Sequence, residues 1–287
     1  MSVVITGATG HLGRLVIDHL LASGVPGETI VAAGRRPEAL APLEARGVLP
    51  VTIDYSDLDS LTTAFAGADT VLLISGSEVG HRVEQHRNVI DAARASGVRR
   101  VVYTSAPHAD TSSLVLAPDH RATEEMLQAS GLTVTVLRNN WYTENYVATA
   151  EQARVTGEVV SSAGAGRVAS ATRADLAAGI AAVLTGEGHD GKVYELTGDV
   201  AWDFHELAAG IGEVLGRPVT YRSVTGEEHL ELLTGAGLDE QTAGFVVALD
   251  GDIREGALAD ATGDLARLIG RPTTSLADGL RAGLVRG

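Results

Sequence analysis

Residues 3–13, VVITGATGHLG, carry the strongest structural signal in the chain. An apolar run ends in a glycine turn, and residues 15–21, LVIDHLL, then have the apolar spacing of a helix packed on a sheet. Gly7 permits the tight turn, Gly10 lets the backbone approach a pyrophosphate, and Gly13 lets helix and strand pack closely. The spacing G-x-x-G-x-x-G therefore predicts a dinucleotide site at the helix N-terminus, where free amide groups meet the anion. The alternative is a tight turn in an α/β domain that binds no nucleotide.

The composition is that of an acidic, globular chain. It has 287 residues, 45% hydrophobic and 21% charged, so it can bury a sizeable core. The formal net charge of -15 argues against nucleic-acid binding through a basic face, because phosphate contacts need clustered Lys and Arg. The absence of cysteine excludes disulfides, thiolate metal sites and cysteine nucleophiles. With no signal-type segment or bilayer-length apolar run, we expect a cytoplasmic protein with no membrane partner.

Strands and helices alternate over roughly the first 105 residues. This alternation predicts a doubly wound, Rossmann-type parallel sheet, whose ligand lies beyond the carboxyl ends of the strands. After the first turn and helix, the expected strands are residues 28–34, 48–53, 69–74 and 98–103, and the expected helices are residues 38–46, 58–65 and 79–96. Further along, we expect helices at 120–128, 175–184 and 202–215, strands at 133–137 and 193–196, and a loop at 161–166.

Two domains are expected. Residues 1–150 form the dinucleotide-binding domain, and residues of about 170–198 return to it. Residues 151–287 form a smaller, mainly helical, substrate-binding lobe.

The end of the second strand predicts the cofactor. Arg35 and Arg36 stand where an acidic residue would favour NAD, whereas arginine suits the 2′-phosphate of NADP. We expect NADPH, with Arg35 as the main partner because it lies nearer the strand. The alternative is that both arginines are solvated loop charges.

Other strand ends supply further candidates. Asp54 is followed by the aromatic Tyr55, and this pair borders the adenine unless Asp54 merely caps a turn. Ser75 and Gly76 either let the ribose and pyrophosphate lie close to the backbone or form an ordinary loop, and Thr104 follows the fifth strand. On the helix at 79–96, His81 and His86 are poorly spaced for a shared metal, so we expect surface or interface positions and no metal site.

Residues 138–146, RNNWYTENY, form the densest polar and aromatic segment of a chain with 4% aromatic residues. We interpret this segment as the wall between nicotinamide and substrate; the alternative is a loop that anchors the second lobe.

The usual proton-donating pair of ketone reductases, Tyr-x-x-x-Lys, is absent. Lys192 is the one lysine, and position 188 is Gly. His120 and Glu124 stand one helical turn apart where the pair would lie, and they could hydrogen-bond. Such a pair shuttles protons near neutral pH in some sites, but a structural role is the more common one.

With these residues in view, the chain resembles the NmrA-like atypical short-chain dehydrogenase/reductases. Within that group it is similar to the type 2 NAD(P)H:quinone oxidoreductases and, somewhat less, to the triphenylmethane dye reductases. The motifs that carry the resemblance are ITGATGHLG (5–13), ISGSEVG (74–80), QHRNVI (85–90), YTS (103–105), HADTS (108–112), LRNNWY (137–142), SATRAD (170–175), GKVYEL (191–196) and LIGRPTT (268–274).

The resemblance implies a flavin-free reductase that takes hydride from NADPH. It departs from the family at His11, usually Gln; at Gly34, usually Val; and at Asn140, usually a small residue that leaves a wider pocket. The candidate catalytic residues are Tyr142, Asn140 and His120. Together with the strand ends, the resemblance makes these the candidate cofactor contacts: Thr6, Gly7, Thr9, Gly10, His11, Leu12, Arg35, Asp54, Ile74, Ser75, Gly76, Thr104, Asn139, Asn140, Trp141 and Tyr142.

Two functions compete. One is an enzyme that reduces quinones or similar small electrophiles with NADPH, as a monomer or homodimer. The other is a regulator that senses NADP(H) and binds a protein partner. The missing Tyr-x-x-x-Lys pair suits the regulator and weakens a third hypothesis, a sugar-nucleotide epimerase. The polar-aromatic segment and the C-terminal lobe favour an enclosed substrate pocket, and hence the enzyme.

Overall fold

The computed structural model describes residues 2–76, 78 and 80–286. Ser77 and Val79, two positions of the ISGSEVG motif, lie outside the described residues. The chain forms two compact units. The first unit comprises Met1–Asp110, Pro118–Asn139 and Leu176–Glu195, and the second comprises Thr111–Ala117, Asn140–Asp175 and Leu196–Gly287.

The first unit alternates strands and helices, largely in the predicted order. Its strands are β1 (Val3–Ile5), β2 (Ile30–Gly34), β3 (Leu49–Thr52), β4 (Thr70–Leu73), β5 (Arg100–Ser105), β6 (Thr133–Asn139) and β9 (Val193–Leu196). Its helices are α1 (His11–Ala22), α2 (Pro37–Glu44), α3 (Leu58–Phe65), α4 (Arg82–Ala95), α5 (Ala117–Ala129) and α7 (Arg173–Thr185), and the short 3-10 helix η1 (Gly27–Thr29) precedes β2.

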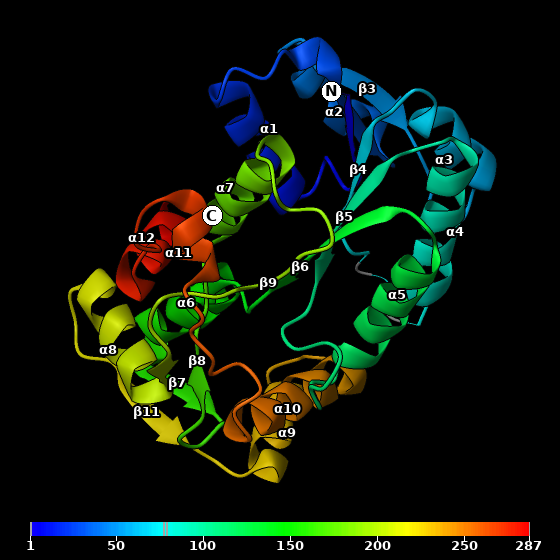
Figure 1. The fold of residues 1–287 in the computed structure, drawn as a ribbon. Helices are drawn as coiled ribbons and strands as arrows, with labels where there is room; N and C mark the ends of the chain where they lie inside the picture. Colours follow the sequence, from blue (N-terminus) through cyan, green and yellow to red (C-terminus); the bar gives the residue numbers. More distant parts are fainter. Residues whose placement is uncertain (1, 77, 79, 287) are drawn as a thin grey trace. The chain divides into compact units, whose positions relative to one another are not determined.

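These strands form one sheet with the order β3-β2-β1-β4-β5-β6-β9 (Figure 1). Every neighbouring pair from β3 across to β6 is parallel. The strand order reverses between β1 and β4, which is the switch point where such sheets bind ligands. The doubly wound parallel sheet predicted from the sequence is confirmed.

Helices cover both faces of this sheet, with α3, α4 and α5 on one face and α1 and α7 on the other (Figure 1). The face under α3, α4 and α5 buries a cluster that includes Phe65, Val89 and Tyr103. Burial of a side chain of this size stabilises the fold by about 1.5–3 kcal/mol. The sheet is therefore a fixed frame for the loops at its carboxyl edge.

Local chemistry explains where these elements begin and end. The side chain of Asp57 accepts hydrogen bonds from the first amide groups of α3, so that helix has its predicted bounds. α5 begins earlier than predicted, at Ala117, because Pro118 lies in its first turn, where a proline needs no N–H partner. β6 continues to Asn139, beyond the predicted end, because Arg138 pairs with Ser105 of β5.

The second unit contains more strand than the sequence suggested. Two short sheets form, an antiparallel pair of β8 and β10 and a parallel pair of β7 and β11. Its elements are η2 (Thr143–Tyr146), α6 (Val147–Thr156), β7 (Glu158–Ser161), β8 (Arg167–Val168), β10 (Trp202–Asp203), α8 (Phe204–Leu215), β11 (Thr220–Ser223), α9 (Gly226–Gly235), α10 (Glu240–Arg254), α11 (Asp264–Ile269) and α12 (Leu276–Arg286).

These short strands explain two corrections in the second unit. The helix expected at 202–215 begins at Phe204, because Trp202 pairs with Val168 and Asp203 caps the helix. The loop expected at 161–166 loses Ser161 to β7. Among the described residues, no helix has the length and apolar character needed to cross a bilayer.

Candidate functional site

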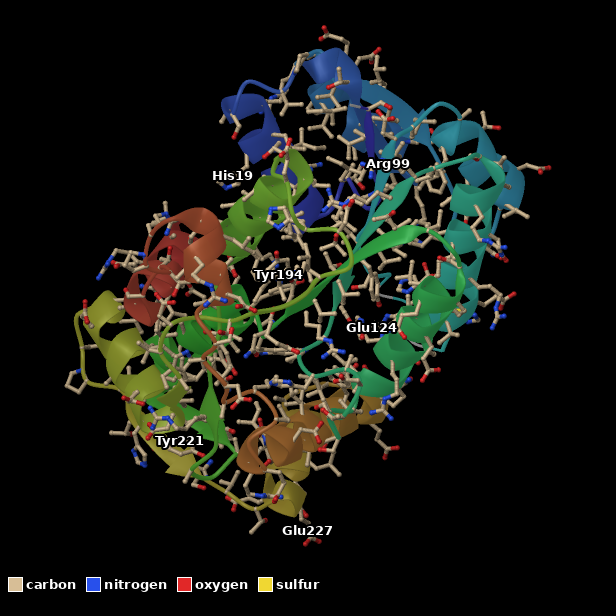
Figure 2. The ribbon with its side chains drawn as sticks, viewed as in Figure 1. His19, Arg99, Glu124, Tyr194, Tyr221 and Glu227 are labelled. Carbon is tan, nitrogen blue, oxygen red and sulfur yellow. The ribbon has the colours of Figure 1, made fainter. Side chains whose placement is uncertain are left out.

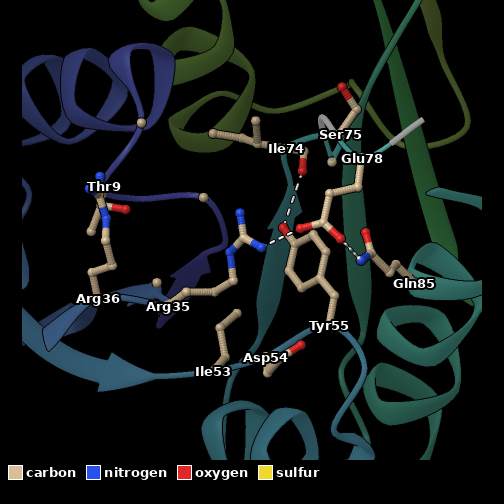
Figure 3. Close-up of a pocket in the computed structure, with 14 residues that line it drawn as sticks. Thr9, Arg35, Arg36, Ile53, Asp54, Tyr55, Ile74, Ser75, Glu78 and Gln85 are labelled. Carbon is tan, nitrogen blue, oxygen red and sulfur yellow. Dashed lines mark hydrogen bonds and ion pairs between the residues drawn. The ribbon is translucent and has the colours of Figure 1, made fainter. Parts of the chain in front are cut away.

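A cavity of about 540 Å³ lies at the carboxyl ends of β1, β2 and β4 in the first unit (Figure 3). Tyr55, which the sequence places beside the adenine together with Asp54, also lines the cavity, and so do Glu78 and Gln85, which were not expected to contact a cofactor. The predicted contacts that line it are Gly7, Thr9, Gly10, Arg35, Asp54, Ile74, Ser75 and Gly76.

The glycine turn forms the part of the cavity suited to a pyrophosphate. Gly7 has a φ of +62°, a conformation that glycine adopts without strain. A Cβ at Gly13 would lie 2.4 Å from the carbonyl oxygen of Gly7, so close packing of α1 on the turn requires glycine there. Gly10 is the N-cap of α1 and has no side chain to satisfy the first amide groups of the helix. His11 and Leu12 are the first residues of that helix.

A second wall, which we call the ledge, is the backbone of residues 74–76. Side chains accept hydrogen bonds from all three of its amide groups. Thr6 Oγ1 accepts from Ile74 N at 3.1 Å, and Thr104 Oγ1 accepts from Ser75 N at 2.9 Å. His86 Nε2 accepts from Gly76 N at 2.9 Å. Thr6 and Thr104 are buried, so in this structure they hold the ledge and do not line the cavity.

The carbonyl groups of the ledge are held as well. The Tyr55 hydroxyl donates to Ile74 O at 3.2 Å, and Arg82 Nε donates to Gly76 O at 2.7 Å. Burial raises the pKa of Tyr55 to about 12, so it remains a donor at neutral pH. These bonds fix the position of the ledge within the first unit.

The surface or interface position predicted for His86 is wrong, because its side chain is fully buried. Since Nε2 accepts from the Gly76 amide, the ring proton is on Nδ1, which lies 3.0 Å from Thr123 Oγ1 of α5. Burial, with a contribution from Arg82, lowers the pKa of His86 to about 3. Packing between α4 and α5, which the helical pattern does not reveal, places this histidine inside the unit.

The predicted bond between His120 and Glu124 is also not formed. His120 Nδ1 lies 2.7 Å from the Tyr103 hydroxyl. Glu124, which is labelled in Figure 2, accepts instead from Ser105 Oγ at 2.6 Å and from Arg138 Nη2 at 2.7 Å. Burial lowers the pKa of His120 to about 3, with smaller effects of Arg82 and His86. The two side chains lie on one helix, but His120 contacts Tyr103 of β5, whereas Glu124 is bonded to Ser105 at the end of β5 and to Arg138 of β6.

Arg138, near the end of β6, joins several carboxylates. It bonds Asp110 at 2.9 Å and Glu195 at 3.0 Å besides Glu124. Burial lowers the pKa of this guanidinium, but hydrogen bonds to Glu124 and Glu195 outweigh that effect and raise it. His108, quoted only as part of the HADTS motif, has a φ of +46°, and its amide donates to Glu195 at 3.2 Å. Sequence reasoning missed this cluster because its members come from four separate segments.

Asn139, at the end of β6, has a buried side-chain amide whose hydrogen-bonding groups are not used within the described residues. Its side chain is 7% exposed, and neither its oxygen nor its nitrogen has a hydrogen-bond partner in the described part of the chain. Buried amides are normally paired, so an unpaired one at the carboxyl edge of a nucleotide-binding sheet fits a polar ligand group. The glycine turn, the arginines after β2 and this amide together fit a dinucleotide.

The remaining predicted contacts belong to the second unit. Asn140 is buried, with Nδ2 donating to Leu258 O at 3.2 Å and Oδ1 accepting from Trp141 N at 2.6 Å. The guanidinium of Arg173 lies 4.5 Å from the centre of the Tyr142 ring. These bonds make Asn140 an anchor within its unit, and Tyr142 presents an aromatic ring already in contact with a cation.

Three side chains, those of Arg35, Glu78 and Gln85, form what we call the rim of the cavity, and they contact one another. Arg35 forms an ion pair with Glu78, and Gln85 Nε2 donates to Glu78 Oε2 at 2.7 Å (Figure 3). Asp54 Oδ1 accepts from the amide and the hydroxyl of Ser56, and these bonds lower the pKa of Asp54.

Residues 2–76, 78 and 80–286 contain no cluster of three or more His, Asp or Glu side chains suited to a metal ion.

Comparisons with known proteins show which family the chain resembles. The model of a family described as NAD(P)H-binding matches residues 7–187. Quinone oxidoreductase 2 of Escherichia coli (strain K12) is 47% identical over 276 residues, which cover 96% of each chain. A crystal structure of the NADPH-dependent quinone oxidoreductase from Escherichia coli with NADPH has a TM-score of 0.94, 46% identity and coverage of 98% of this chain and 99% of that one. Triphenylmethane reductase from Citrobacter sp. with NADP(H) has a TM-score of 0.92, 39% identity and coverage of 99% and 100%.

Proposed function

Because the chain belongs to the NAD(P)H-binding family, we propose that it is an NADPH-dependent oxidoreductase that reduces quinones or similar activated electrophiles. The observation that carries the proposal is the cavity at the switch point of the sheet, with a glycine turn on one side and Arg35 on the other. The extensive likeness to the quinone oxidoreductase of Escherichia coli supports the substrate class.

NADPH, when bound, supplies the hydride. In our proposal the glycine turn and the first amides of α1, including those of His11 and Leu12, bind the pyrophosphate. Arg35 binds the 2′-phosphate, Asp54 borders the adenine, and the ledge supports the ribose. Thr6 and Thr104 act through the ledge that they hold. Asn139, with its unpaired amide, binds a polar group of the cofactor.

The second unit supplies the substrate-binding surface in this proposal. Trp141 and Tyr142 contact the nicotinamide side of the cofactor and a planar acceptor, which stacks on aromatic faces. Asn140 holds the segment in place through its bonds to Leu258 and Trp141. We propose that residues 151–287 are the substrate-binding lobe and that residues 1–150, with residues of about 170–198 returning to them, bind the cofactor. Trp141 and Tyr142 stand at the end of this cofactor-binding part, next to the lobe in sequence.

The missing Tyr-x-x-x-Lys pair explains the choice of substrate. Hydride addition to an ordinary ketone produces a strongly basic alkoxide, which needs a placed proton donor. A quinone instead becomes a phenolate that tolerates its charge until water protonates it, and a cationic dye is neutralised by the hydride. Positioning alone then supplies most of the catalysis. His120 is no substitute donor, since burial lowers its pKa to about 3 and keeps it neutral.

The test is NADPH oxidation followed across a panel of quinones, cationic triphenylmethane dyes and simple aliphatic ketones, with NADH in parallel. We expect turnover of quinones and some dyes, a preference for NADPH, and little activity on ketones. Rapid ketone reduction would contradict the proposed chemistry, and tight NADPH binding without turnover of any acceptor would favour a regulatory protein. We also propose a cytoplasmic location and a monomer or homodimer, which cell fractionation and light scattering test.

A further inference from the structure

The rim of the cavity includes a carboxylate, that of Glu78, which already pairs with Arg35. Glu78 uses both carboxylate oxygens there, one in the ion pair with Arg35 and the other as acceptor of the Gln85 amide (Figure 3). The hydrogen bond from Gln85 and then that from Arg35 lower the pKa of Glu78, so it is a carboxylate at neutral pH. The arginine assigned to the 2′-phosphate therefore already has a negatively charged partner.

The charged side chains that line the cavity show which carboxylate competes for Arg35. Arg35 and Arg36 are the basic side chains that line it, and Asp54 and Glu78 are the acidic ones. Asp54 accepts two bonds from Ser56 within its own turn, whereas Glu78 spans the rim to reach Arg35. Glu78 is thus the carboxylate that competes for the guanidinium.

Because the ion pair of Arg35 and Glu78 is exposed, a phosphate can replace the carboxylate as the partner of Arg35. The Arg35 side chain is 63% exposed and that of Glu78 is 40% exposed. Ion pairs this exposed contribute little free energy, so an incoming phosphate displaces the carboxylate at small cost. A phosphate dianion carries more charge and bonds arginine through a two-armed fork, whereas Glu78 meets Arg35 with one oxygen and gives the other to Gln85.

We propose that Glu78 is a specificity-determining residue that competes with the cofactor 2′-phosphate for Arg35 and so weakens the preference for NADPH over NADH. The inference rests on the proposed function, since it presumes that Arg35 binds the 2′-phosphate. NADPH must displace the Glu78 carboxylate from Arg35, whereas NADH leaves that ion pair in place. The opposite role is a Glu78 that holds Arg35 ready for the phosphate, and it predicts the opposite effect of a substitution.

The test uses equilibrium binding and needs no turnover. Calorimetry on Glu78→Gln and wild type would measure the Kd of NADPH, NADH, adenosine 2′,5′-bisphosphate and adenosine 5′-monophosphate. We expect Glu78→Gln to bind NADPH and the bisphosphate roughly three- to tenfold more tightly, since a competing charge is removed. NADH and the monophosphate should change less than twofold, and the gain should shrink as salt screens the charges.

Glu84→Gln is the matched control. Like Glu78→Gln, it removes one negative charge, but Glu84 is an exposed residue of α4 that does not line the cavity. All four ligands should therefore bind to this variant as they bind to wild type. Unchanged or weaker NADPH binding by Glu78→Gln overturns the inference, and so does an equal gain for both cofactors. A wild type that binds the bisphosphate no better than the monophosphate overturns the proposed cofactor preference itself, a failure visible before any variant is made.

Discussion

The ledge and the rim border the same cavity but are held by different forces. Buried side chains hold the three amide groups of the ledge, and the one histidine among them, His86, is neutral. The rim is an exposed ion pair of Arg35 and Glu78. Breaking a buried hydrogen bond costs the protein stability, whereas breaking an exposed ion pair costs little. The comparison indicates that the ledge builds the site and the rim tunes which ligand enters it.

The largest expected effect is acid destabilisation. His86 and His120 have a pKa of about 3 in the folded chain, against an ordinary histidine pKa of 6.5, so the unfolded chain binds more protons between those two pH values. The stability that comes with neutral histidines is therefore complete above about pH 6.5 and falls as the pH drops toward 3. We expect a loss of about 1.4 kcal/mol per pH unit for each histidine.

Urea unfolding of wild type and His120→Asn at pH 7, 6 and 5 measures this slope. The variant should lose less stability per pH unit, because one buried histidine no longer titrates. Tyr103→Phe removes the partner of His120 but keeps the histidine, so its slope should match wild type. Identical slopes for wild type and His120→Asn would show that the burial of His120 has no energetic consequence.

Thr6→Val tests the ledge next. The methyl group fills the same space but leaves the part-buried Ile74 amide without its acceptor, at a cost of about 1–3 kcal/mol. We expect a lower melting temperature and weaker binding of NADPH and NADH by similar factors, because the ledge supports the part that both cofactors share. Thr6→Ser keeps the hydroxyl and should retain most of both properties. A variant that loses affinity for NADPH alone would contradict the assigned roles of ledge and rim.

Arg35→Ala tests the rim. Loss of the 2′-phosphate contact should weaken NADPH about 10- to 100-fold, equivalent to about 1.4–2.7 kcal/mol, and leave NADH nearly unchanged. The melting temperature should stay constant, since the side chain is exposed. Titration of both cofactors against the variant measures the effect, with Arg36→Ala as the comparison expected to lose less. An equal loss for the two cofactors would refute the assignment.

Tyr142 belongs to neither the ledge nor the rim, so Tyr142→Ala should change the KM for the acceptor and leave cofactor affinity as it is. Loss of a stacking surface should raise the KM for a quinone about two- to tenfold while the affinity for NADPH stays nearly intact. Steady-state kinetics at saturating NADPH measure the KM, and fluorescence titration measures the affinity. If the variant loses both cofactor and substrate binding, the segment is structural.

The smallest expected effect is that of His120→Ala on turnover. Because this histidine is buried and neutral, its loss should leave most of the quinone reductase kcat near neutral pH, even though the fold is less stable. Assays below the melting temperature of the variant separate the two properties. A kcat that collapses and regains activity at lower pH would make His120 a true acid.

The regular elements of the first unit could be predicted because their signals are local. The glycine turn, the apolar period of α1 and the Asp57 cap of α3 each lie within a few residues of the element that they determine. The short strands β7 and β11 could not be predicted, since each has four residues and pairs with a segment about 60 positions away. Their pairing depends on the folded second unit.

The sequence by itself determined the parallel sheet, the glycine turn and the arginines that follow β2. Only the tertiary structure decided which side chains hold the ledge and which anion meets Arg35. Thr6 is 68 positions from Ile74, and Arg35 is 43 positions from Glu78. Strand and helix periods depend on neighbours in sequence, whereas these contacts depend on the order in which strands pack side by side. The physical reason is that backbone preference is local, but a hydrogen bond between distant residues exists only once packing has brought them together.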